Sequence, residues 1–194
     1  MKIQEDKVRC FGGGSGKEYY AHYHDHEWGM PVFDDRKLFE FIILEGAQAG
    51  LSWLTILQRR EFYRQELDQF DVDKIAGYSA KKISSLLENP RLIRNRLKLN
   101  SVVKNAQAFL VVQKQFNSFA DYVWQFVDGQ PKDSRLKKNQ LPPSSSKESD
   151  LLSKDLKKRG FTFVGSKICY AFMQAVGMVN DHNCDCFRYL EVKM

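Results

Sequence analysis

The sequence lacks any hydrophobic stretch long enough to cross a membrane. No apolar run approaches the roughly 18 residues that a spanning helix needs. Residues 1–7 carry charges without the apolar segment of a secretory signal peptide, so we expect the chain to work in a reducing compartment. In that setting the four cysteines (Cys10, Cys169, Cys184 and Cys186) are expected to be thiols or metal ligands rather than disulfides.

Strand-like alternation, internal repeats and a linker between two cores are missing as well. The 194 residues suffice for one domain with a sizeable core. We therefore predict an all-α fold and a single domain over residues 1–194. The net charge of +6 and the pI near 9.1 favour an anionic partner such as nucleic acid.

The chain also lacks the phosphate-binding loop of nucleotide hydrolases. Residues 12–17 read GGGSGK, but Glu18 follows where that motif needs Ser or Thr, and no apolar strand comes before it. We expect residues 11–18 to form a flexible loop.

Helical periodicity and capping residues mark most of the remaining chain. Asp34 and Asp35 precede the first strong pattern, Pro90 precedes the longest, and Ser118 precedes a later one. We predict helices over residues 36–46, 52–70, 71–75, 80–87, 91–116, 119–127, 149 or 150 to 159, and 166–177, with a loop over 128–147.

One carboxylate stands out inside an apolar helix pattern. Glu45 follows Phe41–Leu44 and precedes another apolar stretch that begins at Trp53. Burying an unpaired ionised carboxylate costs several kcal/mol or shifts its pKa, so Glu45 needs a partner or a task. A kinked core helix with a capped glutamate is the structural alternative.

A metal site is a second candidate. Mixed thiolate and imidazole ligands suit zinc, which would tie the two ends of the chain together. His182 and Cys186 are four residues apart, the spacing of two ligands on one helical turn. Spacing alone does not select the ligands among Cys10, His22, His24, His26, His182, Cys184 and Cys186, and scattered residues without a metal are the alternative.

A third candidate is a phosphate site over residues 156–167. A basic helix end, a glycine-flanked hairpin and a new helix at Ser166 follow one another. Free backbone N–H groups and the positive end of the helix dipole suit a phosphate group. An ordinary corner between two helices, with solvated lysines, is the alternative.

Aromatic residues could surround Glu45 and form a cage for a flat cation. Stacking, cation–π attraction and a charge-assisted hydrogen bond would act together in such a cage. The candidates are Tyr19, Tyr20, Tyr23, Trp28 and Trp53, which are otherwise core aromatics.

Seven short motifs, spread over most of the chain, carry a family resemblance. They are YHDHEWG (23–29), KLFE (37–40), LEGAQAGLSW (44–53), DYVW (121–124), LKKRGF (156–161), FVG (163–165) and VNDH (179–182). In this order they resemble the type I DNA-3-methyladenine glycosylases.

The resemblance implies the helix-hairpin-helix DNA glycosylase fold, with residues 154–177 as the DNA-binding element. It implies a structural Zn²⁺ that joins residues 10–30 to residues 178–188. Its implied ligands are Cys10, His24, His182 and Cys186. The implied base pocket contains Tyr20, Tyr23, Glu45 and Trp53, with Glu45 as the catalytic residue that supplies a negative charge and a hydrogen-bond acceptor. Implied DNA contacts are Gly50, Leu51, Gly160, Phe163, Gly165, Ser166 and Lys167.

The activity implied by the resemblance is the release of 3-methyladenine from alkylated double-stranded DNA, which leaves an abasic site. Methylation at N3 makes the base a cation and a good leaving group, so flipping and recognition are the main tasks. The expected enzyme is monomeric, cytoplasmic and nucleoid-associated, with no membrane partner.

Three positions depart from the family pattern. Phe11-Gly12-Gly13 stands where the family usually has a Trp, so Phe11 is expected to form that pocket wall. Asn180 stands where wider helix-hairpin-helix glycosylases have a catalytic Asp, and Asp181 is shifted by one, which suits an enzyme for labile cationic lesions. Lys167 lies near the place where bifunctional relatives form a Schiff base. One alternative is therefore a glycosylase/lyase that uses Lys167. A second, independent alternative is a non-catalytic zinc-stapled DNA-binding module.

Overall fold

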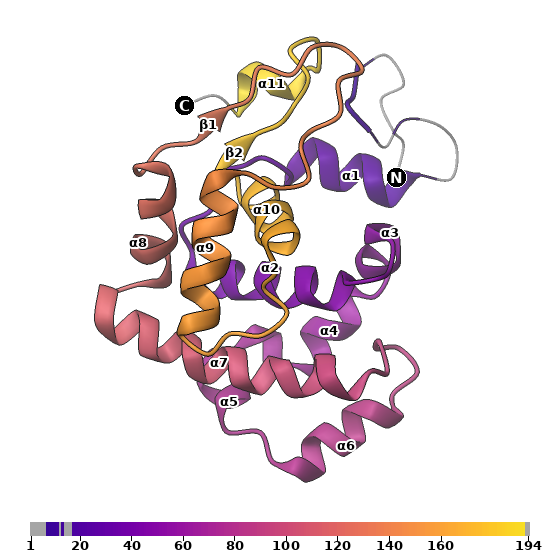
Figure 1. Ribbon diagram of the computed structural model, residues 1–194. Coiled ribbons are helices and arrows are strands. Elements are labelled where there is room, and N and C mark those ends of the chain that lie inside the picture. Colours follow the sequence, from indigo (N-terminus) through magenta and orange to yellow (C-terminus); the bar gives the residue numbers. More distant parts are fainter. Residues whose placement is uncertain (1–6, 12, 14–16, 193–194) are drawn as a thin grey trace.

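The computed structural model describes residues 7–11, 13 and 17–192, so half of the expected loop over residues 11–18 lies outside the described part. The fold is mostly helical, as predicted (Figure 1). Its elements are α1 (Glu18–His26), α2 (Asp35–Gln48), α3 (Trp53–Leu57), α4 (Arg60–Glu66), η1 (Asp68–Phe70), α5 (Val72–Ala76), α6 (Ala80–Glu88), α7 (Arg96–Phe116), α8 (Phe119–Trp124), η2 (Gln125–Val127), β1 (Lys132–Asp133), α9 (Lys147–Lys158), α10 (Ser166–Ala175), β2 (Val179–Asn180) and α11 (Arg188–Glu191). Among the described residues, none of these helices combines the length and apolar character that crossing a membrane requires.

Helix α2 forms the centre of the core. Every residue from Leu38 to Ala47 is buried, so this helix contacts protein on all sides. Asp34 caps it by accepting a hydrogen bond from the Lys37 backbone N–H at 2.8 Å. Helices α7, α8 and α10 pack around α2 (Figure 1). A side chain on α2 can therefore reach the middle of the molecule.

The predicted helix over residues 52–70 is wrong as a single element. The chain breaks at Gln58 and Arg59, and it leaves helical geometry at Gln69, where φ is +56°. The first break turns Arg60 inward, and its guanidinium donates to Glu27 at 2.8 Å and to the buried Glu40. This buried ion pair outweighs the continuous helical pattern of the sequence.

Several boundaries also differ from the prediction. Helix α7 starts at Arg96 rather than at residue 91, because the Asn95 side chain accepts the Lys98 N–H and caps it there. Helix α9 is capped by Ser146, not by Ser149 or Asp150, and Ser149 completes a capping box. The final long helix, α10, ends at Ala175 rather than at residue 177.

The sequence patterns missed the elements that join the two ends of the chain. Helix α1 was not predicted, nor were β1 and β2, which pair in parallel (Lys132 with Val179, Asp133 with Asn180). In Figure 1 the coloured part of the chain before α1 lies with β1, β2 and α11 at one end of the molecule, beside α1. Such short elements carry little periodicity, since contacts between distant segments hold them.

Candidate active site and metal cluster

A cavity of about 750 Å³ opens between α2, α10 and the joined chain ends. It is lined by Val8, Arg9, Cys10, Phe11, Tyr23, Trp28, Glu45, Gln48, Trp53, Lys138, Asn139, Gln140, Leu141, Pro142, Ala171, Gln174, Asp181, Asn183 and Asp185. Its volume lies within the usual range for small-ligand sites. Several predicted pocket residues therefore meet in one place although they come from distant segments.

Glu45 lies in this cavity without the partner that a structural acid would have. Its side chain is 3% exposed, and within the described residues its Oε2 accepts no hydrogen bond. Burial raises the pKa of Glu45 to about 8. An open acceptor in a protected cavity suits a ligand that brings a donor or a positive charge.

Glu40, one and a half turns earlier on α2, gives the contrast. It is also buried, at 5% exposure, but Arg60 and Arg64 donate to its Oε1. Burial alone would raise the pKa of Glu40, yet Arg60, Lys37 and Arg64 together lower it. The same helix thus carries one carboxylate that arginines neutralise, Glu40, and one carboxylate without such a partner among the described residues, Glu45.

Aromatic rings form the walls next to Glu45. Tyr23 of α1 and Trp53 of α3 pack at a centroid distance of 5.5 Å, and the buried Trp53 Nε1 has no acceptor among the described residues. Burial first, and then the nearby Glu45, raise the pKa of Tyr23. Phe11 lines the cavity and packs on Trp28 at 4.8 Å, as expected for a replacement wall.

Two of the candidate aromatics do not reach the cavity. Tyr20 packs edge-on against Phe11 at 5.8 Å and supports the wall from behind. Tyr19 is 59% exposed and lies in a different surface hollow. Both residues precede Tyr23 on α1, so the turn of the helix carries their side chains to other faces.

The cavity also includes residues that the sequence patterns do not predict for it. Gln48 is one turn after Glu45 on α2, a spacing that could have suggested it. Residues 138–142 also line the cavity, where the Asn183 side chain holds them by donating to the backbone oxygens of Lys137 (2.8 Å) and Gln140 (3.1 Å). No local pattern marks these contacts. Ala171, Gln174 and Asp181 complete the wall on the α10 side.

Gly50 and Leu51 form an exposed tip directly after α2. Gly50 has φ of +77°, which favours glycine, and Leu51 is 40% exposed. The Lys98 ammonium donates to the backbone oxygens of Ala47 (2.8 Å) and Ala49 (2.6 Å). Lys98, on α7, therefore fixes the end of α2 from which the tip projects.

The hairpin over residues 160–165 lies against the same end of α2. A Cβ atom at Gly46 would lie 3.2 Å from the Phe163 Cβ, so glycine allows the close approach. Asn105 of α7 holds the hairpin by accepting the Thr162 N–H at 2.8 Å and donating to the Thr162 oxygen at 3.0 Å. The hairpin is thus fixed next to the residue that follows Glu45.

Helix α10 starts directly after the hairpin with Gly165 as its cap residue. Gly165 offers no side chain to the first N–H groups of the helix, which therefore remain available to an anion. The Ser166 hydroxyl is already bonded to Asp150 and Ser149, so only its backbone N–H is free for such a role. Lys167 is exposed and does not line the cavity.

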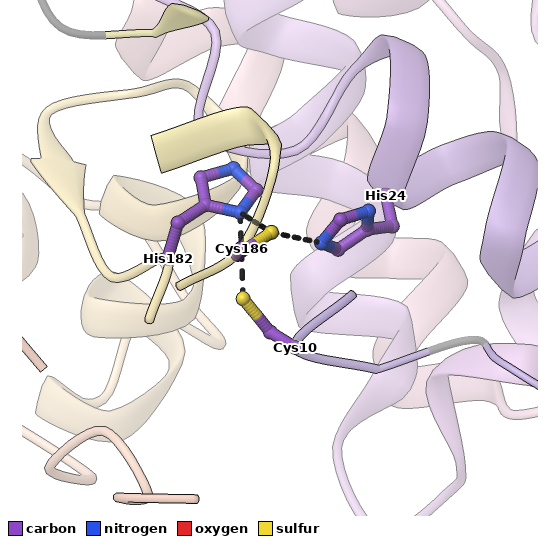
Figure 2. A group of neighbouring side chains, drawn as sticks. All are labelled: Cys10, His24, His182 and Cys186. Atoms are coloured by element: carbon purple, nitrogen blue, oxygen red, sulfur yellow. Dashed lines mark hydrogen bonds between the residues drawn. The ribbon is translucent and has the colours of Figure 1, made fainter. Parts of the chain in front are cut away.

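The four predicted zinc ligands converge at one point (Figure 2). The ligand atoms of Cys10, His24, His182 and Cys186 all lie within 4.8 Å of one another. Cys186 Sγ is 3.3 Å from His24 Nε2 and 3.5 Å from His182 Nδ1, and Cys10 Sγ is 3.5 Å from the same Nδ1. The four-residue spacing predicted His182 and Cys186 on one turn of a helix, but the segment that joins them is not helical.

Neighbouring groups orient the ligand atoms toward this point. His24 Nδ1 lies 2.9 Å from Asp25, which Arg9 pairs at 2.7 Å, so Nε2 faces the cluster. His182 Nε2 lies 3.1 Å from the Trp28 oxygen, so Nδ1 faces the cluster. Two sulfurs and two oriented imidazole nitrogens form a donor set that could hold a metal ion such as zinc. His22, His26, Cys169 and Cys184 are not part of the cluster.

These features define a mostly helical protein with a buried carboxylate in an aromatic-lined cavity and a Cys/His cluster at its joined ends. The family model described as methyladenine glycosylase matches residues 14–189. The chain therefore belongs to the methyladenine glycosylase family.

Known relatives support this assignment over nearly the whole chain. The DNA-3-methyladenine glycosylase of Haemophilus influenzae is 50% identical over 179 residues, which cover 92% of this chain and 96% of the relative. A crystal structure of 3-methyladenine DNA glycosylase I superposes with a TM-score of 0.89 at 49% identity and covers 93% of this chain and 98% of that one. A variant of 3-methyladenine DNA glycosylase I in complex with 3-methyladenine has a TM-score of 0.87 at 36% identity, with 90% and 94% covered.

Proposed function

We propose that this enzyme is a DNA-3-methyladenine glycosylase of base excision repair, which hydrolyses the bond between 3-methyladenine and deoxyribose. The observation that carries the proposal is the open, buried carboxylate of Glu45 in an aromatic cavity. A non-catalytic DNA-binding module would gain nothing from burying such a group, which costs stability.

The charge of the damaged base gives Glu45 its role. Methylation at N3 leaves a permanent positive charge on the adenine, and normal adenine is neutral. The arriving cation offsets the cost of ionising Glu45, so a buried carboxylate selects damaged bases over normal ones. Tyr23 and Trp53 add π faces that attract the same cation. The water that attacks the sugar then completes hydrolysis and leaves an abasic site.

The neighbouring elements would handle double-stranded DNA. Leu51 at the tip fills the gap left by the flipped nucleotide, and the hairpin with the start of α10 holds the backbone as a helix-hairpin-helix element. Gly160 and Gly165 give the hairpin its close backbone approach, and Lys167 adds a phosphate contact. All of these residues come from one copy of the chain, so a monomer suffices.

We also propose that Cys10, His24, His182 and Cys186 hold a structural Zn²⁺. The donor set and its orientation support zinc, and the cluster ties residues near the start of the chain to the segment between β2 and α11. The bound ion would supply stability and not chemistry, because four protein ligands leave no position open for water.

Methylated DNA provides the direct test. The protein is incubated with it, and the released bases are separated by chromatography. We expect release of 3-methyladenine without strand cleavage, loss of most activity in Glu45→Gln, and full activity in the control Glu88→Gln, which alters an exposed glutamate on α6. No base release by the wild-type protein would contradict the proposed function. Strand cleavage that depends on Lys167 would support the lyase instead.

A further inference from the structure

A second buried carboxylate, Asp181, lines the same cavity as Glu45. Asp181 is 2% exposed and lies between β2 and His182. Two donors from α10 hold its Oδ2: the Tyr170 hydroxyl at 2.9 Å and Gln174 Nε2 at 2.7 Å. The other oxygen, Oδ1, is buried and accepts no hydrogen bond among the described residues.

The preceding residue, Asn180, has a different task. Its side-chain amide donates to the Tyr189 oxygen at 3.1 Å, and its Oδ1 accepts the His182 N–H at 3.2 Å. Both bonds join parts of the chain end, and Asn180 does not line the cavity. In the sequence Asp181 is displaced by one residue from the usual position of a catalytic Asp, but in the fold Asp181 is the residue that lines the cavity.

No cation neutralises Asp181 in the described part of the chain. Its carboxylate takes part in none of the ion pairs there, and Arg9, the buried cation of the cavity wall, pairs with Asp25. Burying a carboxylate with only one of its two oxygens hydrogen-bonded costs free energy, and the fold gains no stability from it in return. Its open oxygen therefore suits a positive charge that the ligand brings.

During the reaction the positive charge moves from the base to the sugar, so a single carboxylate beside the base cannot stabilise both positions. When the C1′–N9 bond breaks, its electron pair goes to N9 and the base becomes neutral, while C1′ and O4′ of the sugar become positive. A carboxylate that contacts the base loses attraction during this step. Only a carboxylate near the sugar gains attraction in the transition state, and only such a gain accelerates bond cleavage.

We propose that Asp181 is this second carboxylate. Glu45 selects the cationic base, and the Asp181 carboxylate stabilises the sugar cation. It then accepts one proton from the water whose oxygen bonds to C1′. One water is consumed, and the products are neutral 3-methyladenine, the abasic sugar and a proton. This inference rests on the proposed function.

The test compares Asp181→Asn with wild-type enzyme in three measurements. Under single turnover on methylated DNA we expect a loss of roughly 100-fold, the usual scale for removing one preorganised electrostatic group. Affinity for free 3-methyladenine should stay within a few-fold of wild type. The preference for DNA with a cationic pyrrolidine abasic analogue over DNA with a neutral tetrahydrofuran analogue should fall about tenfold.

Two further variants separate charge from structure. The asparagine oxygen can still accept from Tyr170 and Gln174, so Asp181→Asn should fold. Tyr170→Phe keeps the charge but removes one donor, and we expect a smaller loss of rate and of analogue preference. Asp128→Asn neutralises an exposed carboxylate in the turn after η2 and should match wild type.

Three results would overturn the role of Asp181. They are a wild-type rate in folded Asp181→Asn, an equal loss of affinity for both abasic analogues, or a parallel loss of affinity for free 3-methyladenine. Failure of wild-type enzyme to release 3-methyladenine would instead contradict the proposed function, so the two failures are distinguishable.

Discussion

The open carboxylate of Glu45 should make the free enzyme less stable as the pH rises. Burial raises the pKa of Glu45 from about 4.5 to about 8, so the folded state keeps a proton that the unfolded chain releases. The stability from this proton is fully present below pH 4.5 and is lost as the pH rises through 8. At about 1.4 kcal/mol per pH unit, the whole loss is about 5 kcal/mol.

Glu45→Gln removes the titration and keeps the shape. Between pH 5.5 and 8.5 the wild type should lose about 3 kcal/mol relative to this variant. For a chain of this size that corresponds to about 6–12 °C in relative Tm. Thermal unfolding of both proteins across this range measures the difference, in which the titrations of all other groups cancel. The same Tm difference at both ends of the range would refute the description of Glu45 as buried and unpaired.

The activity should move in the opposite direction. The cationic base pairs with ionised Glu45, so kcat/KM on methylated DNA should rise with pH toward a plateau above the pKa near 8. The rise reflects the proton that must leave Glu45 before the cation can bind. A flat profile from pH 6 to 9 would mean that Glu45 is already ionised in the free enzyme.

Four other predictions address the supporting elements. A chelator should release about one zinc per chain and lower Tm strongly, and Cys186→Ser should lower Tm in the same way. An unchanged Tm would contradict a structural ion. Gly46→Val should cost roughly 1–3 kcal/mol by pushing against the hairpin, measured by denaturant unfolding. Lys98→Met should weaken DNA binding severalfold but leave binding of free 3-methyladenine intact, since Lys98 fixes only the tip. Lys167→Ala should reduce the salt dependence of DNA binding by about one phosphate contact, and borohydride should not trap Lys167 on abasic DNA.

The sequence predicted features that depend on local chemistry. Asp34 and Ser118 cap helices as expected, because a capping side chain acts only three residues away. The resemblance selected the four cysteine and histidine residues that converge, a choice that spacing alone left open. These successes needed either short-range rules or a family pattern.

The missed features depend on contacts between distant segments. Helix α1 buries only a few residues and is stabilised at the joined chain ends, so it has little periodicity of its own. Residues 138–142 enter the cavity wall because Asn183, more than 40 residues later, binds their backbone. The position of Asp181 depends likewise on Tyr170 and Gln174. A local sequence pattern contains no information about such contacts between distant segments.

Glu40 and Glu45 show most directly what the fold adds to the sequence. Both lie in the same apolar helix and both are buried, so their local patterns are alike. They differ because the chain breaks before Arg60 and brings its guanidinium to Glu40, whereas no cation from the described part of the chain pairs with Glu45. Whether a buried acid is structural or functional is therefore decided by where the cations of other segments lie. The same criterion, applied to Asp181, separates it from Asp25, whose charge is paired with Arg9.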